Sequence, residues 1–136
     1  MIGVVIVTHC RLGAELISTA EFILGRIEGI ISVSIDLQVS TEVMRTEIEK
    51  SINQVDQGDG IIILTDMFGG TPSNLSLSFL SAAKVEVLTG VNLPMLIKLI
   101  QSREKTELAE LAEMVGAYGR NSINVAGEVL SRRSED

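Results

Sequence analysis

The residues best suited to chemistry are one histidine, one aspartate and a glycine-rich segment. His9 is the single histidine among 136 residues, so any imidazole chemistry of this chain must use it. Asp66 opens the segment Asp66–Pro72, which contains Gly69 and Gly70. A carboxylate that accepts a hydrogen bond from one ring nitrogen fixes the tautomer of a histidine and leaves the other nitrogen free. The pair therefore predicts a nucleophile or base at His9, provided that the fold brings both residues together.

Gly69 and Gly70 predict an anion site in the same segment. Glycines let the backbone turn tightly and expose its N–H groups, and a helix that begins at Thr71-Pro72 would direct the positive end of its dipole to the same place. Backbone amides in such an arrangement bind phosphate. The hydroxyl of Thr71 is expected either to cap this helix or to contact the anion. Together with His9 and Asp66, the segment predicts phosphoryl chemistry at the histidine.

Each of these residues also has a structural interpretation. A lone histidine is often a structural or surface residue, and an aspartate before glycines often caps a turn. Cys10 suggests a cysteine hydrolase, but adjacent strand residues point to opposite faces, so we expect Cys10 to be a small filler. No P-loop, GxGxxG or zinc-ligand spacing is present, so neither a cofactor nor a metal is expected. Met67 and Phe68 suit a protein-binding surface as well as ordinary packing.

The elements that must position these residues alternate between strands and helices. Residues 2–7 and 61–64 are apolar runs typical of strands buried on both faces, and residues 31–39 alternate as a half-exposed edge strand does. Residues 85–88 predict another strand, and helical spacing fills the intervals, with a helix capped by Asn92 after the last of these strands. The pattern predicts an open α/β fold with a parallel sheet. Ligands of such sheets bind at the carboxyl ends of the strands, where His9 and Asp66 fall.

Length and charge limit the possible functions. The chain suits one domain, which we place at residues 1–130, with residues 131–136 as a disordered tail. One cysteine rules out a disulfide framework, and the start does not look like a signal peptide, so the cytoplasm is expected. No apolar run approaches the roughly 18–20 residues that span a bilayer. A net charge of −7 argues against nucleic acid and anionic membranes as partners.

Three motifs in order resemble the Enzyme IIA component of the mannose family of the bacterial phosphoenolpyruvate-dependent sugar phosphotransferase system (PTS). They are Thr8-His9 at the end of the first strand, Asp66–Asn74 and Thr89–Met95. The resemblance implies a phosphotransferase in which Nε2 of His9 accepts a phosphoryl group from the phosphocarrier protein HPr and passes it to an Enzyme IIB component. It also implies that Asp66 bonds Nδ1, and that Thr71 lies beside a phosphoryl group held by Gly69 and Gly70.

The resemblance further implies a sheet with strand order 2-1-3-4 and a homodimer. Ile123–Ala126 is the candidate for a fifth, antiparallel strand exchanged between subunits. Enzyme IIB is expected to be a separate protein and to mediate any association with the membrane subunits IIC and IID, without direct membrane insertion. Two alternatives stay open: a regulatory protein whose phosphorylation at His9 controls a partner without sugar transport, and the phosphoryl donor to dihydroxyacetone kinase. Many relatives are expected to have Gly in place of Cys10.

Overall fold

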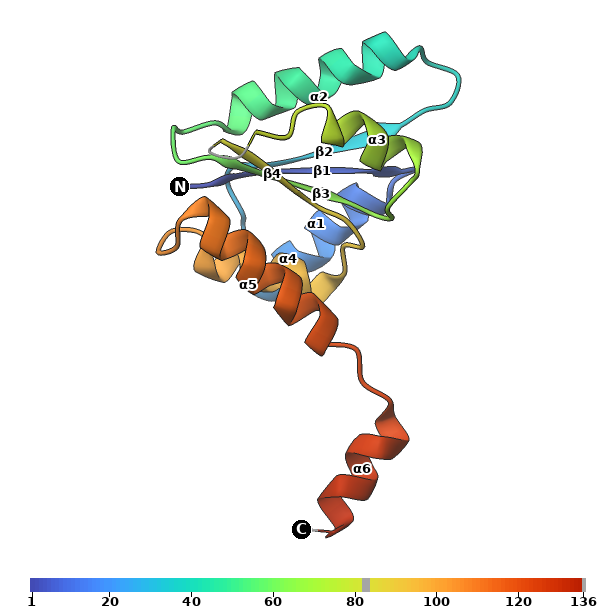
Figure 1. Cartoon of the computed structure of the whole chain (residues 1–136), viewed down its shortest axis with the longest axis vertical. Coiled ribbons are helices and arrows are strands. Elements are labelled where there is room, and N and C mark those ends of the chain that lie inside the picture. Colours follow the sequence, from blue (N-terminus) through green and yellow to red (C-terminus); the bar gives the residue numbers. More distant parts are fainter. Residues whose placement is uncertain (82–83, 136) are drawn as a thin grey trace.

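A parallel sheet forms the centre of the computed structural model, which describes residues 1–81 and 84–135 (Figure 1). Its strands are β1 (Gly3–His9), β2 (Ile30–Ile35), β3 (Ile61–Thr65) and β4 (Val85–Leu88). Their order is β2-β1-β3-β4, and every neighbouring pair is parallel. The predicted α/β class and the 2-1-3-4 order are therefore confirmed, and β1 and β3 lie side by side.

Helices cover both faces of the sheet (Figure 1). On one face lie α1 (Leu12–Leu24), α4 (Leu93–Ser102) and α5 (Leu108–Asn121), and on the other lie α2 (Thr41–Val55) and α3 (Thr71–Leu77). Helices on both faces explain why β1 and β3 consist of apolar residues rather than alternating ones. Across the described parts of the chain, no helix has the length and apolar character needed to cross a membrane.

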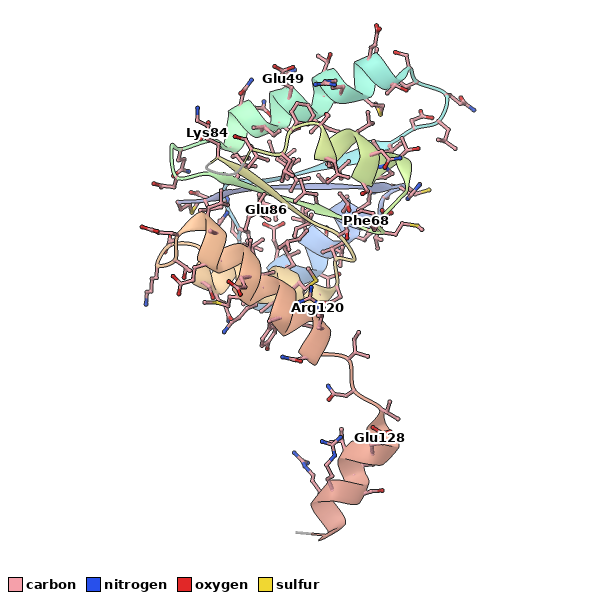
Figure 2. The ribbon with its side chains drawn as sticks, viewed as in Figure 1. Glu49, Phe68, Lys84, Glu86, Arg120 and Glu128 are labelled. Atoms are coloured by element: carbon pink, nitrogen blue, oxygen red, sulfur yellow. The ribbon has the colours of Figure 1, made fainter. Side chains whose placement is uncertain are left out.

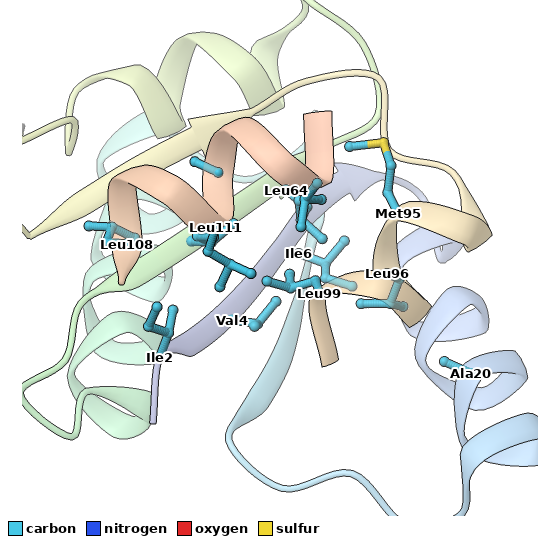
Figure 3. Close-up of a cluster of buried hydrophobic side chains, with 13 residues drawn as sticks. Ile2, Val4, Ile6, Ala20, Leu64, Met95, Leu96, Leu99, Leu108 and Leu111 are labelled. Carbon is cyan, nitrogen blue, oxygen red and sulfur yellow. The ribbon is translucent and has the colours of Figure 1, made fainter. Parts of the chain in front are cut away.

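Alternate residues of β1 and β3 enter two separate cores. Val4, Ile6, Ile62 and Leu64 pack with α4 and α5, as Figure 3 shows in part. Val5, Val7, Ile61 and Ile63 pack with α2 and with Leu75 of α3. By the same alternation His9 follows Val5 and Val7, so its side chain leaves the sheet on the α3 side.

Side chains in the loops explain where two elements begin and where β2 ends. Ser40 accepts a hydrogen bond from the amide of Val43 at 3.3 Å and caps α2. Asn92 accepts one from the amide of Met95 at 3.0 Å, which confirms the predicted cap at Asn92. β2 is an edge strand, as expected, but the predicted extent to Val39 was wrong. Asp36 ends the strand because its carboxylate accepts a bond from the amide of Gln38 at 2.9 Å and folds a turn.

The C-terminal segment differs from the sequence prediction. Residues 122–125 form a connection rather than the predicted strand over Ile123–Ala126. α6 (Ala126–Glu135) includes residues 131–135 of the segment expected to be a disordered tail, and residue 136 lies outside the described residues. α6 projects away from the rest of the chain (Figure 1). Local contacts explain the helix: the amide of Val129 donates to the carbonyl of Val125 at 3.2 Å, and Arg132 lies 4.0 Å from Glu128. The predicted strand over Ile123–Ala126 would form only by pairing with the sheet edge of a second subunit.

Candidate functional site

His9 and Asp66 meet at the carboxyl ends of β1 and β3. Oδ2 of Asp66 lies 2.8 Å from Nδ1 of the His9 ring and accepts a second bond from the His9 backbone amide at 2.9 Å. Its other oxygen, Oδ1, accepts from the amide of Met67 at 2.9 Å. The Asp66 side chain is 13% exposed and the His9 side chain 42% exposed. The carboxylate is thus held at three points while the imidazole stays accessible.

The surroundings of Asp66 keep it ionised. Burial raises the pKa of its carboxyl, but the bonds from the His9 amide and ring, the charge of His9 and the bond from the Met67 amide outweigh burial and leave the pKa below its ordinary value. An ionised carboxylate can only accept hydrogen bonds, so Nδ1 carries a proton in this contact. In a neutral ring Nε2 then has the free lone pair. In this arrangement Nε2 is the ring nitrogen that can act as a nucleophile or base.

Gly70 lies against the edge of the imidazole that carries Cε1 and Nε2. A Cβ atom built on Gly70 would lie 3.0 Å from Cε1 and 3.5 Å from Nε2 of His9, so only a glycine leaves this edge free. Gly69 before it has a φ of +88°, a left-handed conformation that favours glycine. The two glycines thus bring the backbone after Asp66 close to Nε2.

Two expectations about the neighbours of His9 need correction. Gly70, not Thr71, is the N-cap residue of α3, and Thr71 is an exposed first residue of the helix. Cys10 is not a buried filler: it is exposed and has a φ of +51°. The reason is that β1 ends at His9, and the chain turns at Cys10 into α1. The argument from strand alternation therefore did not apply to Cys10.

Val91 and Asn92, in the segment after β4, bind the ends of neighbouring elements beside the site. The amide of Val91 donates to the carbonyl of Thr65 at 2.9 Å, which fixes the loop beside the end of β3. Besides capping α4, the side-chain amide of Asn92 donates to the carbonyl of Gly119 in α5 at 3.3 Å. The motif around Asn92 thus joins three elements, and its observed contacts are structural.

Met67 and Phe68 are exposed beside the histidine rather than packed in the core. Their exposed fractions are 56% and 72%. Figure 2 places Phe68 at the end of the sheet where β3 leaves it. The sequence analysis included Thr8 in the Thr8-His9 motif but gave it no role. Its buried Oγ1 accepts a bond from the amide of Gly13 at 2.9 Å and fixes the turn after His9. The sequence signals for Thr8 are its place in that motif and its polar side chain at the end of an apolar strand.

Comparison with known proteins identifies the family. A family model described as "PTS system fructose IIA component" matches residues 3–116. The chain belongs to this family. The fructose-specific EIIA component of the PTS from Bacillus subtilis is 26% identical over 133 residues, which are 97% of this chain and 91% of that protein. A crystal structure of an EIIA component from Streptococcus agalactiae superposes with a TM-score of 0.85 at 26% identity, covering 94% of this chain and 99% of that one.

A second relative shows the family domain as part of a longer protein. The mannose-specific EIIAB component of Escherichia coli K12 is 30% identical over 127 residues, which are 90% of this chain and 39% of that protein. Membership in the EIIA family confirms the resemblance to mannose-type EIIA components and the phosphocarrier role in the sugar PTS, and it makes the chain a phosphotransferase component. The regulatory alternative is not favoured by these relatives.

Proposed function

We propose that Nε2 of His9 is the atom that carries the phosphoryl group, received from phospho-HPr and passed to an Enzyme IIB component. The observation that carries this proposal is the 2.8 Å contact between Nδ1 of His9 and Oδ2 of Asp66, which leaves Nε2 as the free nucleophile. Its lone pair attacks phosphorus, the P–N bond to the histidine of HPr breaks, and the electron pair of that bond returns to the donor ring. The carboxylate of Asp66 balances the positive charge that develops on the His9 ring.

Backbone groups of Gly69 and Gly70, with the hydroxyl of Thr71, offset the charge of the transferring group. This assignment is supported by the position of Gly70 against Cε1 and Nε2, and by the exposed position of Thr71 directly after it. Their contribution is electrostatic, since dipoles that are already oriented need no reorganisation during transfer. Neither a nucleotide nor a metal takes part in the step that we propose.

Met67 and Phe68 form the docking contacts for both protein partners. Their exposure next to His9 supports this role, because donor and acceptor must each bring a phosphohistidine or its acceptor side chain to the same Nε2 atom. The two partners therefore bind in turn to one surface. Through Enzyme IIB the chain would associate with the membrane subunits IIC and IID. The cytoplasmic location of the chain itself stays a prediction.

The chain forms a homodimer in this proposal, with Ile123–Ala126 as the exchanged segment. Support comes from the exposed apolar side chains of Ile123 (76%), Val125 (61%) and Leu130 (63%), and from β4, which lies at an edge of the sheet. Such side chains gain stability when a second subunit covers them. Sedimentation of the full chain tests this: twice the mass of one chain is expected, and a monomer at high concentration would contradict it.

The phosphocarrier assignment is tested by incubation with phosphoenolpyruvate, Enzyme I and HPr, followed by intact mass measurement. We expect the wild-type chain to gain the mass of one phosphoryl group and His9→Ala to gain none. Omission of HPr controls for direct transfer from Enzyme I. The absence of a gain in the wild type, or an equal gain in His9→Ala, would contradict the assignment.

A further inference from the structure

Two buried hydroxyls flank the loop that carries the site. Thr65 directly precedes Asp66, and Ser73 directly follows Pro72. Both residues are 0% exposed, and among the residues that the structure describes neither side-chain oxygen has a hydrogen-bond partner. Ser76, equally buried in α3, differs because its hydroxyl donates to the carbonyl of Pro72 at 2.6 Å. The two unpartnered groups thus lie at the two ends of one functional segment.

Thr65 and Ser73 lie in the same layer of the fold. Ile61 and Ile63 of β3 pack in the core that includes Leu75 of α3, so strand alternation places Thr65 on the α3 side as well. Ser73 is buried on α3, which packs against β1 and β3. The register pairs Thr65 with Val7, two residues before His9 on the same face. Both residues therefore belong to the layer between the sheet and α3, on the face of the sheet that carries the His9 side chain.

A buried hydroxyl without a partner destabilises the state in which it occurs, because it has lost its hydrogen bonds to water. Any state in which the two hydroxyls bond to each other is relieved of this penalty. Thr65 is fixed in the sheet by its pairing with β1, whereas Ser73 is the third residue of a seven-residue helix that follows the glycines. A small shift of the start of α3 is the simplest movement that brings the two oxygens together.

We propose that Thr65 and Ser73 are positioning residues whose hydroxyls bond to each other when residues 66–72 close on phosphorylated His9. The inference rests on the proposed function and extends it to the energetics of the loop. The negative phosphoryl group attracts the backbone amides around Gly70, and this attraction moves the start of α3 toward Nε2. The hydroxyl bond then forms only in the phosphorylated state and stabilises it relative to the free chain.

The test is the equilibrium distribution of the phosphoryl group between HPr and this chain. We expect Thr65→Val and Ser73→Ala each to shift the equilibrium about tenfold toward phospho-HPr, the size of one net hydrogen bond. The double variant should shift it no further than either single one, because both substitutions remove the same bond. Thr65→Ser, which keeps the hydroxyl, should restore the wild-type equilibrium.

Ser76→Ala is the matched control, since it removes a buried hydroxyl of the same helix whose partner lies within α3. We expect it to leave the equilibrium unchanged. Thermal unfolding of the unphosphorylated Thr65→Val and Ser73→Ala chains should show equal or higher stability, because each substitution removes a buried polar group without a partner. That combination of an undiminished stability and a weaker phosphorylated state is a result that a merely structural role does not produce.

Three outcomes would overturn the inference. An unchanged equilibrium in both single variants would show that the two hydroxyls do not bond to each other. Additive shifts in the double variant would show two independent effects. A shift in Ser76→Ala as large as that in Ser73→Ala would show a general effect of α3. The proposed function is judged separately by the wild type. If the wild type accepts no phosphoryl group from phospho-HPr, both proposals fail; if it is fully labelled and the variants match it, only the pairing fails.

Discussion

Gly70→Ala tests whether the backbone at the end of the site loop touches the reactive edge of His9. Gly70 has a φ of −86°, which alanine adopts without strain, so the substitution adds only a methyl group. That methyl would lie 3.0 Å from Cε1, tighter than ordinary contact, and 3.5 Å from Nε2. The ring must therefore move by a few tenths of an ångström against its bond to Asp66, and the methyl occupies space beside the incoming phosphorus.

The expected result is a large kinetic effect with a small change in stability. Alanine at an N-cap costs about 0.5–1 kcal/mol relative to glycine, and the loss of freedom in the unfolded chain offsets about 0.4–1 kcal/mol. The free energy of unfolding should therefore change by less than about 1 kcal/mol. A misplacement of about 1 Å can cost about 100-fold in rate, so a shift of a few tenths of an ångström, with the crowding of Nε2, predicts about tenfold slower transfer.

Rapid-quench transfer from radiolabelled phospho-HPr measures the rate, and denaturant unfolding measures the stability. Gly58→Ala is the control, because Gly58 has a φ of +91° and a Cβ there would meet nothing within 4 Å. We expect this control to lose about 1–2 kcal/mol of stability and to transfer at the wild-type rate while folded. A wild-type rate in folded Gly70→Ala would refute the placement of Gly70 against the reacting nitrogen.

Asp66→Asn keeps the shape of the side chain but removes its charge. We expect about 10- to 100-fold slower transfer, because a hydrogen bond to a charged group contributes about 1.5–3 kcal/mol. An unchanged rapid-quench rate would contradict the role of Asp66. Because the pKa of Asp66 lies below its ordinary value of 3.8, its contribution to stability is present above about that pH and is lost as the pH falls through the lowered pKa. Unfolding curves between about pH 5 and pH 2 should therefore lose more free energy in the wild type than in Asp66→Asn, and parallel losses would show that Asp66 contributes nothing. Phe68→Ala should weaken the affinity for HPr about tenfold, as measured by calorimetry. The free energy of unfolding should stay unchanged, because the Phe68 side chain is 72% exposed. Undiminished affinity would exclude Phe68 from the docking surface.

The meeting of His9 with Asp66 followed from the sequence because strand ends obey simple geometry. Two apolar runs without alternation require helices on both faces, and the parallel order then puts the residues that follow β1 and β3 at one edge. The adjacency of β1 and β3 was predicted from the family resemblance, because apolar runs alone do not specify the order of the strands. The site's polar pair was therefore predictable once the order was known.

Residues whose roles depend on backbone turns or distant partners were not predictable. Cys10 was misplaced because nothing in the sequence marks the last residue of β1. Arg103 has no sequence signal, yet it is buried and donates to the carbonyls of Ile2 and Gly29 at 3.3 and 3.1 Å, and also to the carbonyl of Glu28. Burial lowers the pKa of its guanidinium. The unpartnered hydroxyls of Thr65 and Ser73 likewise become visible only when the layer between β3 and α3 is assembled.

The identity of the phosphorylated nitrogen tests the account most directly. The contact of Nδ1 with Asp66 leaves Nε2 as the nucleophile, so phosphorus and nitrogen NMR of the phosphorylated chain, with labelled histidine, should show one phosphohistidine with the P–N bond at Nε2 of His9. A phosphoryl group on Nδ1 would contradict the account, because that nitrogen would then have to leave Asp66 before transfer.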